Sequence, residues 1–156
     1  MSGILVLCLL GIVVAMVLAA AVWDLRTRTI PNELNGAVAL LAIPFWWATG
    51  MKLWPDVAIQ LGIGAALFAV FMGAFALGAM GGGDVKLIGA LGLWLPVEAI
   101  LPLVIIMSLS GGVLTLGMLV RHRLAKHQHK LEIPYGVAIA VGGVWLIGEQ
   151  FLNQFA

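Results

Sequence analysis

Charged side chains are scarce in this chain of 156 residues, where eight Lys or Arg and seven Asp or Glu make up 10% of the total. A soluble domain carries about one charge in four residues, so a water-soluble globule is excluded. Apolar residues reach 63%, and the mean hydropathy is +1.13. The net charge of +1 gives no basic field that would attract nucleic acid, and no nucleic-acid partner is expected. The composition predicts an integral membrane protein in contact with the lipid bilayer.

Cysteines and metal-binding patterns are also lacking. Cys8 is the only cysteine, which excludes an internal disulfide and a Cys-rich zinc site. His122, His127 and His129 share one basic stretch, and no acidic residue follows them at the spacing of an H-E-x-x-H motif. No expected span contains a histidine, so a Ser-His nucleophile is not indicated either. We therefore predict neither a metal nor a cofactor.

The uncharged stretches predict an all-α, polytopic membrane protein with one domain over residues 1–156 and about six transmembrane helices, because a span needs roughly 20 apolar residues. The expected spans are approximately 3–23, 34–51, 57–80, 85–97, 99–120 and 133–153. The first is expected to be a retained helix, ended by Asp24, because its apolar stretch is too long for a signal peptide and no basic region precedes it. The fourth is short, so we expect it to be tilted or partly submerged.

Basic residues are divided unequally between the expected loops. Only Lys52 falls in the second or fourth loop, and the other seven fall in the odd loops, namely Arg26, Arg28, Lys86, Arg121, Arg123, Lys126 and Lys130. Positive loops face the cytoplasm, so we expect the odd loops inside and both termini outside. Trp46, Trp47, Trp54 and Trp94 then fall toward the outer interface, as in an aromatic belt.

Two carboxylates stand out in this topology. Asp24 ends the first expected span and Asp84 precedes the fourth, so both are expected at the same depth on the cytoplasmic side, with Asp56, Glu98 and Glu149 opposite. Two carboxyl groups at one depth can share a proton, one acting as base on a water and the other polarising a carbonyl. This is the arrangement of an aspartyl protease. The alternative is that each aspartate only marks a membrane interface.

Glycines 81–83 directly precede Asp84. Glycine permits a tight turn and the close approach of a substrate strand, and irregular backbone at membrane depth is tolerated where it lines protein or water. A water-accessible cleft is therefore predicted here. The alternative is a passive turn, with Gly78 and Gly82 forming a helix-packing face.

Three motifs together resemble one known family. Gly81-Gly82-Gly83-Asp84 matches the G-x-G-D signature of type IV prepilin leader peptidases, and Asp24-Leu25-Arg26-Thr27-Arg28-Thr29-Ile30-Pro31-Asn32 is similar to their other aspartate segment. Ile133-Pro134-Tyr135-Gly136 is similar to the I-P-[FY]-G that opens their last span. The motifs occur in the family's order and cover nearly the whole chain.

The resemblance implies an aspartic endopeptidase of the bacterial inner membrane that cuts the basic leader from prepilins or pseudopilins at the cytoplasmic face. The family's catalytic aspartates match Asp24 and Asp84, and the glycines of its signature match Gly81 and Gly83. The insertion with paired C-x-x-C motifs that larger members carry, together with their N-methyltransferase activity, is absent. The chain thus resembles the short, peptidase-only Tad/Flp form, and no methyltransferase activity is expected. Archaeal preflagellin peptidases are the nearest enzymatic alternative.

Further residues of these motifs are expected to support the site, each with a plainer alternative. Arg26 and Arg28 either position Asp24 or only fix the topology, and Lys86 either acts on Asp84 or extends to the interface. Asn32 belongs to the first aspartate segment, and Pro134 and Gly136 are expected to shape the entry of the last helix near the site. The competing class of function is a transporter subunit or pilus-assembly scaffold that uses Asp24 and Asp84 to bind ions or protons.

Overall fold

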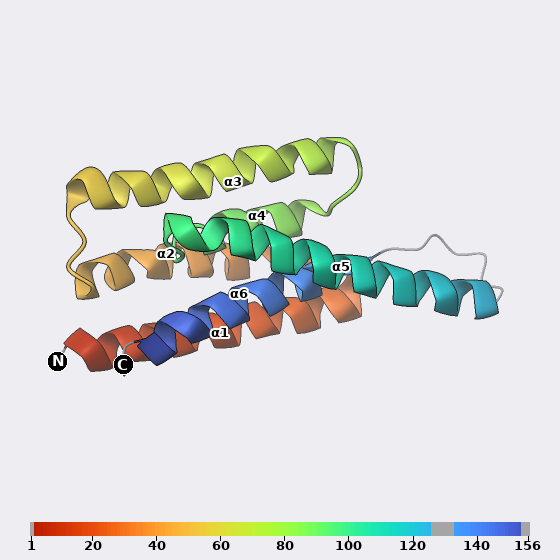
Figure 1. The fold of residues 1–156 in the computed structure, drawn as a ribbon, viewed down its shortest axis with the longest axis horizontal. Helices are drawn as coiled ribbons and strands as arrows, with labels where there is room; N and C mark the ends of the chain where they lie inside the picture. Colours follow the sequence, from red (N-terminus) through yellow and green to blue (C-terminus); the bar gives the residue numbers. More distant parts are fainter. Residues whose placement is uncertain (1, 126–132, 154–156) are drawn as a thin grey trace.

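The computed structural model describes residues 2–125 and 133–153, which form six α-helices and no β-strand (Figure 1). The helices are α1 (Ser2–Thr27), α2 (Asn32–Ala48), α3 (Ala58–Ala76), α4 (Gly82–Leu91), α5 (Val97–Ala125) and α6 (Tyr135–Asn153), and a short helical turn, η1 (Leu53–Val57), precedes α3. The expected all-α fold is confirmed.

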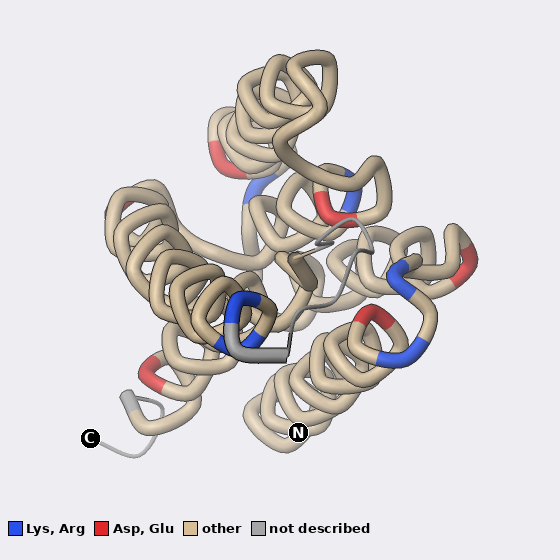
Figure 2. The backbone as a smooth tube through the Cα atoms, turned by 90° about the vertical axis from the view of Figure 1, so that its right-hand side faces the viewer, with Lys and Arg blue, Asp and Glu red and all other residues tan. Residues whose placement is uncertain are grey.

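The helices alternate in direction along the long axis of the molecule. Both ends of the chain lie at the left of Figure 1, and α1, α3 and α5 finish at the right, where α2, α4 and α6 begin. We call the right-hand end the basic end, because Arg26, Arg28, Lys86, Arg121 and Arg123 belong to it, and the other the termini end. Figure 2 views the molecule from the basic end. The first, third and fifth connections therefore leave the helices at one end, as the charge pattern predicts.

Helix α4 is the short central element. It packs against α2, α3 and α6, and every residue from Asp84 to Leu91 is buried except Lys86. Around it, α1 packs on α2 and α6, and α5 packs on α6. A ten-residue helix extends only about 15 Å. Helix α4 therefore places its first turn, which contains Asp84, among longer helices.

The outer surface of the bundle is apolar. Large apolar side chains such as Leu40, Val70 and Val113 are more than half exposed, as expected where lipid covers the protein. Four helical stretches are long and apolar enough to cross a membrane, namely Gly3–Thr27, Leu53–Ala76, Val97–Arg123 and Tyr135–Leu152. The chain is thus a polytopic all-α membrane protein. Helices α2 and α4 are shorter, and the count of six spans stays a prediction.

The inner face of α1 explains how its aspartate comes to be buried. Its buried apolar residues recur at helical spacing, namely Val6, Leu9, Leu10, Val13, Val17, Ala20 and Ala21. Asp24 follows Ala20 by four positions and Ala21 by three, so it lies on the same face of the helix. The core stripe of α1 therefore carries Asp24 into the interior.

Several helix ends differ from the predicted spans. Helix α1 continues to Thr27 instead of ending at Asp24, and the chain leaves it at Arg28, whose φ of 57° is in the left-handed region. Helix α3 ends at Ala76, because Gly78, with a φ of 71°, turns the chain away from the helical path. Helix α5 runs to Ala125, so Arg121, His122 and Arg123 are helical rather than part of a loop. His127, His129, Lys126 and Lys130 lie outside the described residues.

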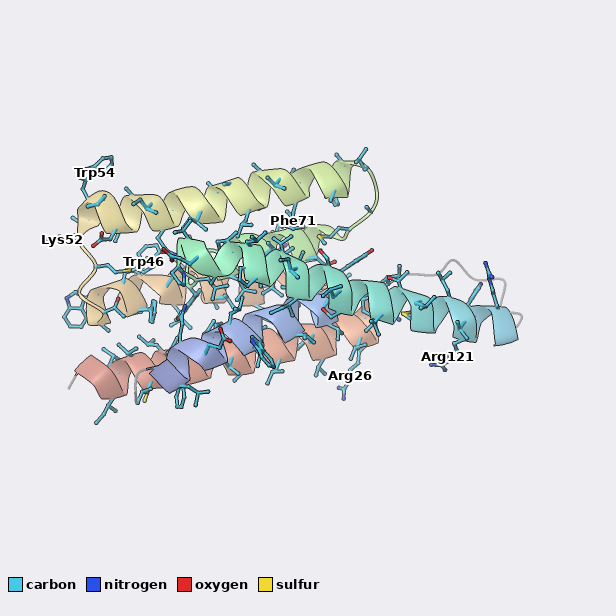
Figure 3. All side chains as sticks on the ribbon, in the orientation of Figure 1. Arg26, Trp46, Lys52, Trp54, Phe71 and Arg121 are labelled. Carbon is cyan, nitrogen blue, oxygen red and sulfur yellow. The ribbon has the colours of Figure 1, made fainter. Side chains whose placement is uncertain are left out.

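The expectation of an aromatic belt is wrong for two of the four tryptophans. Trp94 and Trp46 are only 2% and 8% exposed, and their indole N–H groups donate to the carbonyls of Val38 and Leu93. Trp47 and Trp54 are about four-fifths exposed. Figure 3 shows Trp46 and Trp54 near the termini end, with Trp46 turned inward. A tryptophan at a helix end serves the core when a backbone carbonyl is within reach of its N–H.

Candidate active site

Asp24 is held by the first turn of α6. The side chain is 4% exposed, and its Oδ2 accepts a hydrogen bond of 2.8 Å from the backbone N–H of Gly136. A Cβ atom on Gly136 would lie 2.8 Å from that oxygen and 2.9 Å from the Cβ of Asp24. The backbone of α6 therefore reaches the Asp24 carboxylate only because residue 136 is glycine. Pro134, which is buried, directly precedes this turn.

Asp84 accepts a hydrogen bond from the start of its own turn, residues 81–84, which we call the glycine turn. Gly81 lies just before α4, and its backbone N–H donates to Asp84 Oδ2 over 3.2 Å. A Cβ on Gly81 would lie only 2.9 Å from the same oxygen. The side chain is 6% exposed, and its Oδ1 is buried with no hydrogen-bond partner in the structure. One oxygen is thus fixed by the turn, and the other is a buried acceptor.

The chain segments that carry the two aspartates lie against each other. Ile30, in the connection after α1, contacts Gly83, where an added Cβ would lie 3.1 Å from the Ile30 nitrogen and 3.2 Å from its oxygen. From α2, the side chain of Asn35 donates to the carbonyl oxygen of Gly83 over 3.0 Å. These contacts join the Asp24 segment, the start of α2 and the glycine turn into one unit.

The two carboxyl groups also act on each other electrostatically. Asp84 belongs to α4, outside the four stretches able to cross a membrane. Burial and, next, the charge of Asp24 raise the pKa of Asp84 to about 7, against a smaller lowering by the Gly81 N–H. A carboxyl group with this pKa retains a proton near neutral pH while a neighbour is ionised. This is the electrostatic condition for general acid and base roles.

The basic residues expected near the site have different surroundings. Lys86 is exposed and donates to Asn32 Oδ1 over 2.7 Å, linking α4 to the start of α2 instead of contacting Asp84. Arg28 is exposed but lies within electrostatic reach of Asp24. Arg26 is exposed and lines an outer cavity of about 430 Å³ with Trp23 and Thr27. Figure 3 shows the Arg26 side chain pointing away from the bundle.

Sequence reasoning missed Ile30 and Asn35. Asn35 is 4% exposed, and its Oδ1 is buried without a hydrogen-bond partner in the structure. Its signal in the sequence is an amide inside an apolar helix, since such a group needs a partner within the protein. The described residues contain no group of three His, Cys, Asp or Glu side chains that could hold a metal ion.

Comparisons with known proteins give a family match and two curated relatives. Residues 11–116 match the model of the type IV leader peptidase family, a stretch that contains both Asp24 and Asp84. A prepilin leader peptidase/N-methyltransferase of Pectobacterium carotovorum subsp. carotovorum is 30% identical over 138 residues, covering 86% of this chain and 48% of that protein. A protein of the same description from Bacillus subtilis (strain 168) is 27% identical over 147 residues, covering 91% and 56%.

The chain spans about half the length of these curated relatives. No solved structure gives a significant match. The family match covers more than half of the chain and includes both buried aspartates. The chain belongs to the type IV leader peptidase family.

Proposed function

We propose that the protein is an aspartic endopeptidase that removes the basic leader from type IV prepilins or pseudopilins at the cytoplasmic face of the inner membrane. The observation that carries the proposal is the pair of buried carboxyl groups from α1 and α4, each fixed through Oδ2 by a backbone N–H at the basic end. The names of the two relatives support prepilin as the substrate.

Asp24 and Asp84 divide the acid and base roles. One carboxylate removes a proton from a water as the water oxygen attacks the scissile carbonyl, and the other, protonated, donates its proton to the carbonyl oxygen. On collapse of the tetrahedral intermediate, the C–N bond breaks and the leaving amine takes up a proton from the pair. Burial and the charge of Asp24 raise the pKa of Asp84 to about 7, so the pair is able to hold one proton near neutral pH.

The neighbouring residues position this pair. Gly136 and Gly81 supply the N–H groups, and Gly83 lets the glycine turn fit against Ile30. Asn32 and Lys86 join the start of α2 to α4, and Arg28 adds positive charge near Asp24. No cofactor enters this scheme. The 156 residues hold a single cysteine, Cys8, and so no paired C-x-x-C motif, and we expect leader cleavage by these residues without N-methylation.

The test is cleavage of a membrane-inserted prepilin by Asp24→Asn, Asp84→Asn and the double variant. Each amide preserves size but loses the titrating proton, so all three are expected to fall to a similar floor, at least about 10²-fold below wild type. Asp56→Asn is the matched control, because Asp56 accepts the Lys52 N–H at the termini end and is expected to leave cleavage unchanged.

The outcomes also separate a peptidase from a transporter or scaffold. A fall of only two- or threefold in either single variant, with normal protein levels, contradicts the paired mechanism. Absence of prepilin cleavage by the wild-type protein, together with a proton or ion flux in proteoliposomes that the double variant loses, would instead favour the transport function.

A further inference from the structure

A cavity of about 470 Å³ opens beside the glycine turn, between α2 and α3 on the surface of α4. Its volume falls in the range of roughly 300 to 1,000 Å³ that is usual for ligand sites. Helices α2 and α3 both pack on α4, and Figure 1 shows α4 lying between them. The lining covers about two turns of each helix, so the cavity is an elongated groove that begins near the basic end.

The lining is apolar and made largely of small residues. Gly36 and Ala39 come from α2, Ala65 from α3 and Ala90 from α4, with Leu61 and Phe68 along the wall of α3. Small side chains allow another helix to approach closely within a membrane. By itself this lining is compatible with lipid contact only.

Polar groups at one end of the groove distinguish it from a lipid-facing surface. Asn35 lines the cavity and is 4% exposed, and its Oδ1 is a buried acceptor with no hydrogen-bond partner in the structure. Its Nδ2 donates to the carbonyl of Gly83, the residue before Asp84. A buried acceptor without a partner is unfavourable, and a lipid tail has no N–H to satisfy it. The Asn35 amide therefore links the groove to the active site and calls for a donor such as a peptide N–H.

The positive charge of Lys86 at the mouth of the groove favours one part of a prepilin over another. Lys86 and Asn32 line the cavity and are joined by their 2.7 Å hydrogen bond. A lysine at this place repels a basic leader, and the apolar walls exclude it further. An apolar segment meets neither obstacle, and within the membrane it must be helical to satisfy its backbone.

We propose that this groove is the substrate subsite for the apolar segment that follows the cleaved bond, with Asn35 as its polar contact next to Asp84. The inference rests on the proposed function and adds where the substrate lies. One face of the substrate helix projects side chains between α2 and α3, which places the bond at its cytoplasmic end against the glycine turn.

Filling the groove tests this directly, because a Cβ on Gly36 meets nothing within 4 Å. Gly36 lines the groove, so Gly36→Phe adds a bulky side chain there from a position where the backbone has room for a Cβ. Gly11→Phe is the matched control: Gly11 is also open, and it lines a different apolar cavity of about 520 Å³ between α1 and α6. The assay is cleavage, in proteoliposomes, of a prepilin with a basic leader followed by an apolar segment of about 20 residues.

We expect Gly36→Phe to raise KM at least about tenfold with kcat changed less than about threefold, and Gly11→Phe to match wild type. A wild-type KM for Gly36→Phe, or an equal loss in Gly11→Phe, overturns the assignment. Failure of the proposed function looks different, because the wild-type protein would then cleave no prepilin, or Asp84→Asn would cleave like wild type.

Crosslinking supplies a measurement that does not depend on turnover. In a Cys8→Ser, Asp84→Asn background, Gly36→Cys is expected to form a disulfide, under copper phenanthroline, with a cysteine in the first two turns of the substrate's apolar segment. Gly11→Cys is expected to form none with the same substrate. Absence of the Gly36→Cys crosslink, or equal crosslinking at both positions, overturns the subsite.

Discussion

At the scale of single residues, Gly136 is the place in the site where backbone and a carboxyl group pack most tightly. An alanine there would keep the N–H that Asp24 accepts but would place a Cβ 2.8 Å from its Oδ2. The carboxyl group must then move, and a displacement of about 1 Å can cost about 10²-fold in rate. We expect Gly136→Ala to lose about that much prepilin cleavage at normal protein levels.

Gly148→Ala is the control for this prediction, because it lies on the same helix and a Cβ there meets nothing within 4 Å. Wild-type activity in Gly136→Ala would show that Asp24 does not need its present position.

The glycine turn gives a second prediction at this scale. A side chain on Gly83 would press on the backbone of Ile30 at 3.1 to 3.2 Å, whereas a Cβ on Gly82 makes ordinary contact with Phe75 at 3.4 Å. We expect Gly83→Val to abolish cleavage while the protein still inserts at normal levels, and Gly82→Ala to remain active. Full activity in Gly83→Val, measured in the same cleavage assay, would mean that the turn is passive.

The predictability of the site differs from residue to residue. The depth of Asp24 and Asp84 follows from where apolar stretches stop, and Gly81 and Gly83 follow from their motif. The partner of Lys86 does not, since Asn32 and Lys86 are joined only when α2 packs on α4. Asn35 was missed for the same reason, because its bond to Gly83 spans 48 positions of sequence. Long-range hydrogen bonds leave little trace in local pattern.

At the scale of helices, hydropathy located every helix but not its ends. The apolar stretch 57–80 gives no sign that α3 stops at Ala76, because the end is set by the turn at Gly78. Trp94 was expected at the membrane interface, yet its bond to Val38 places it inside the bundle. Hydropathy measures affinity for an apolar environment and does not distinguish lipid from protein core.

The short length of α4 makes its C-terminal end depend on a neighbour. Gln60 of α3 is 5% exposed, and its Nε2 donates to the carbonyls of Gly92 and Leu95 at 2.7 Å each. Gln60→Leu would leave both buried carbonyls without this donor, at a cost on the order of 2 kcal/mol. We expect a lower melting temperature in detergent than for wild type.

The matched control for Gln60 is Gln150→Leu, whose amide makes one longer contact of 3.4 Å with the Trp94 carbonyl. Equal stability of wild type and Gln60→Leu would contradict the role of Gln60 in ending α4.

At the scale of the whole molecule, the arrangement of helices and the distribution of charge agree. Arg26 and Arg121 lie toward one end of the bundle in Figure 3, and Lys52 lies at the other. Of the described Lys and Arg residues, Arg28 lies in the first connection, and Arg26, Lys86, Arg121 and Arg123 lie in helices near the basic end. Figure 2 shows the basic end, where α1 finishes and α4 begins, so Asp24 and Asp84 belong to this end.

This asymmetry predicts the orientation in the membrane. Basic loops are retained in the cytoplasm, so reporter fusions after Arg28 and within residues 121–130 are expected to read cytoplasmic. Fusions near Lys52 and at residue 156 are expected to read external, with a reporter that is active only outside the cytoplasm.

Replacing both Arg26 and Arg28 by Gln should weaken the orientation of the first helix, whereas Lys52→Gln should not. An external reading within 121–130 would place the aspartates on the far side of the membrane from the proposed cleavage, because α5 finishes at the basic end, beyond the end of α1 and the start of α4 (Figure 1).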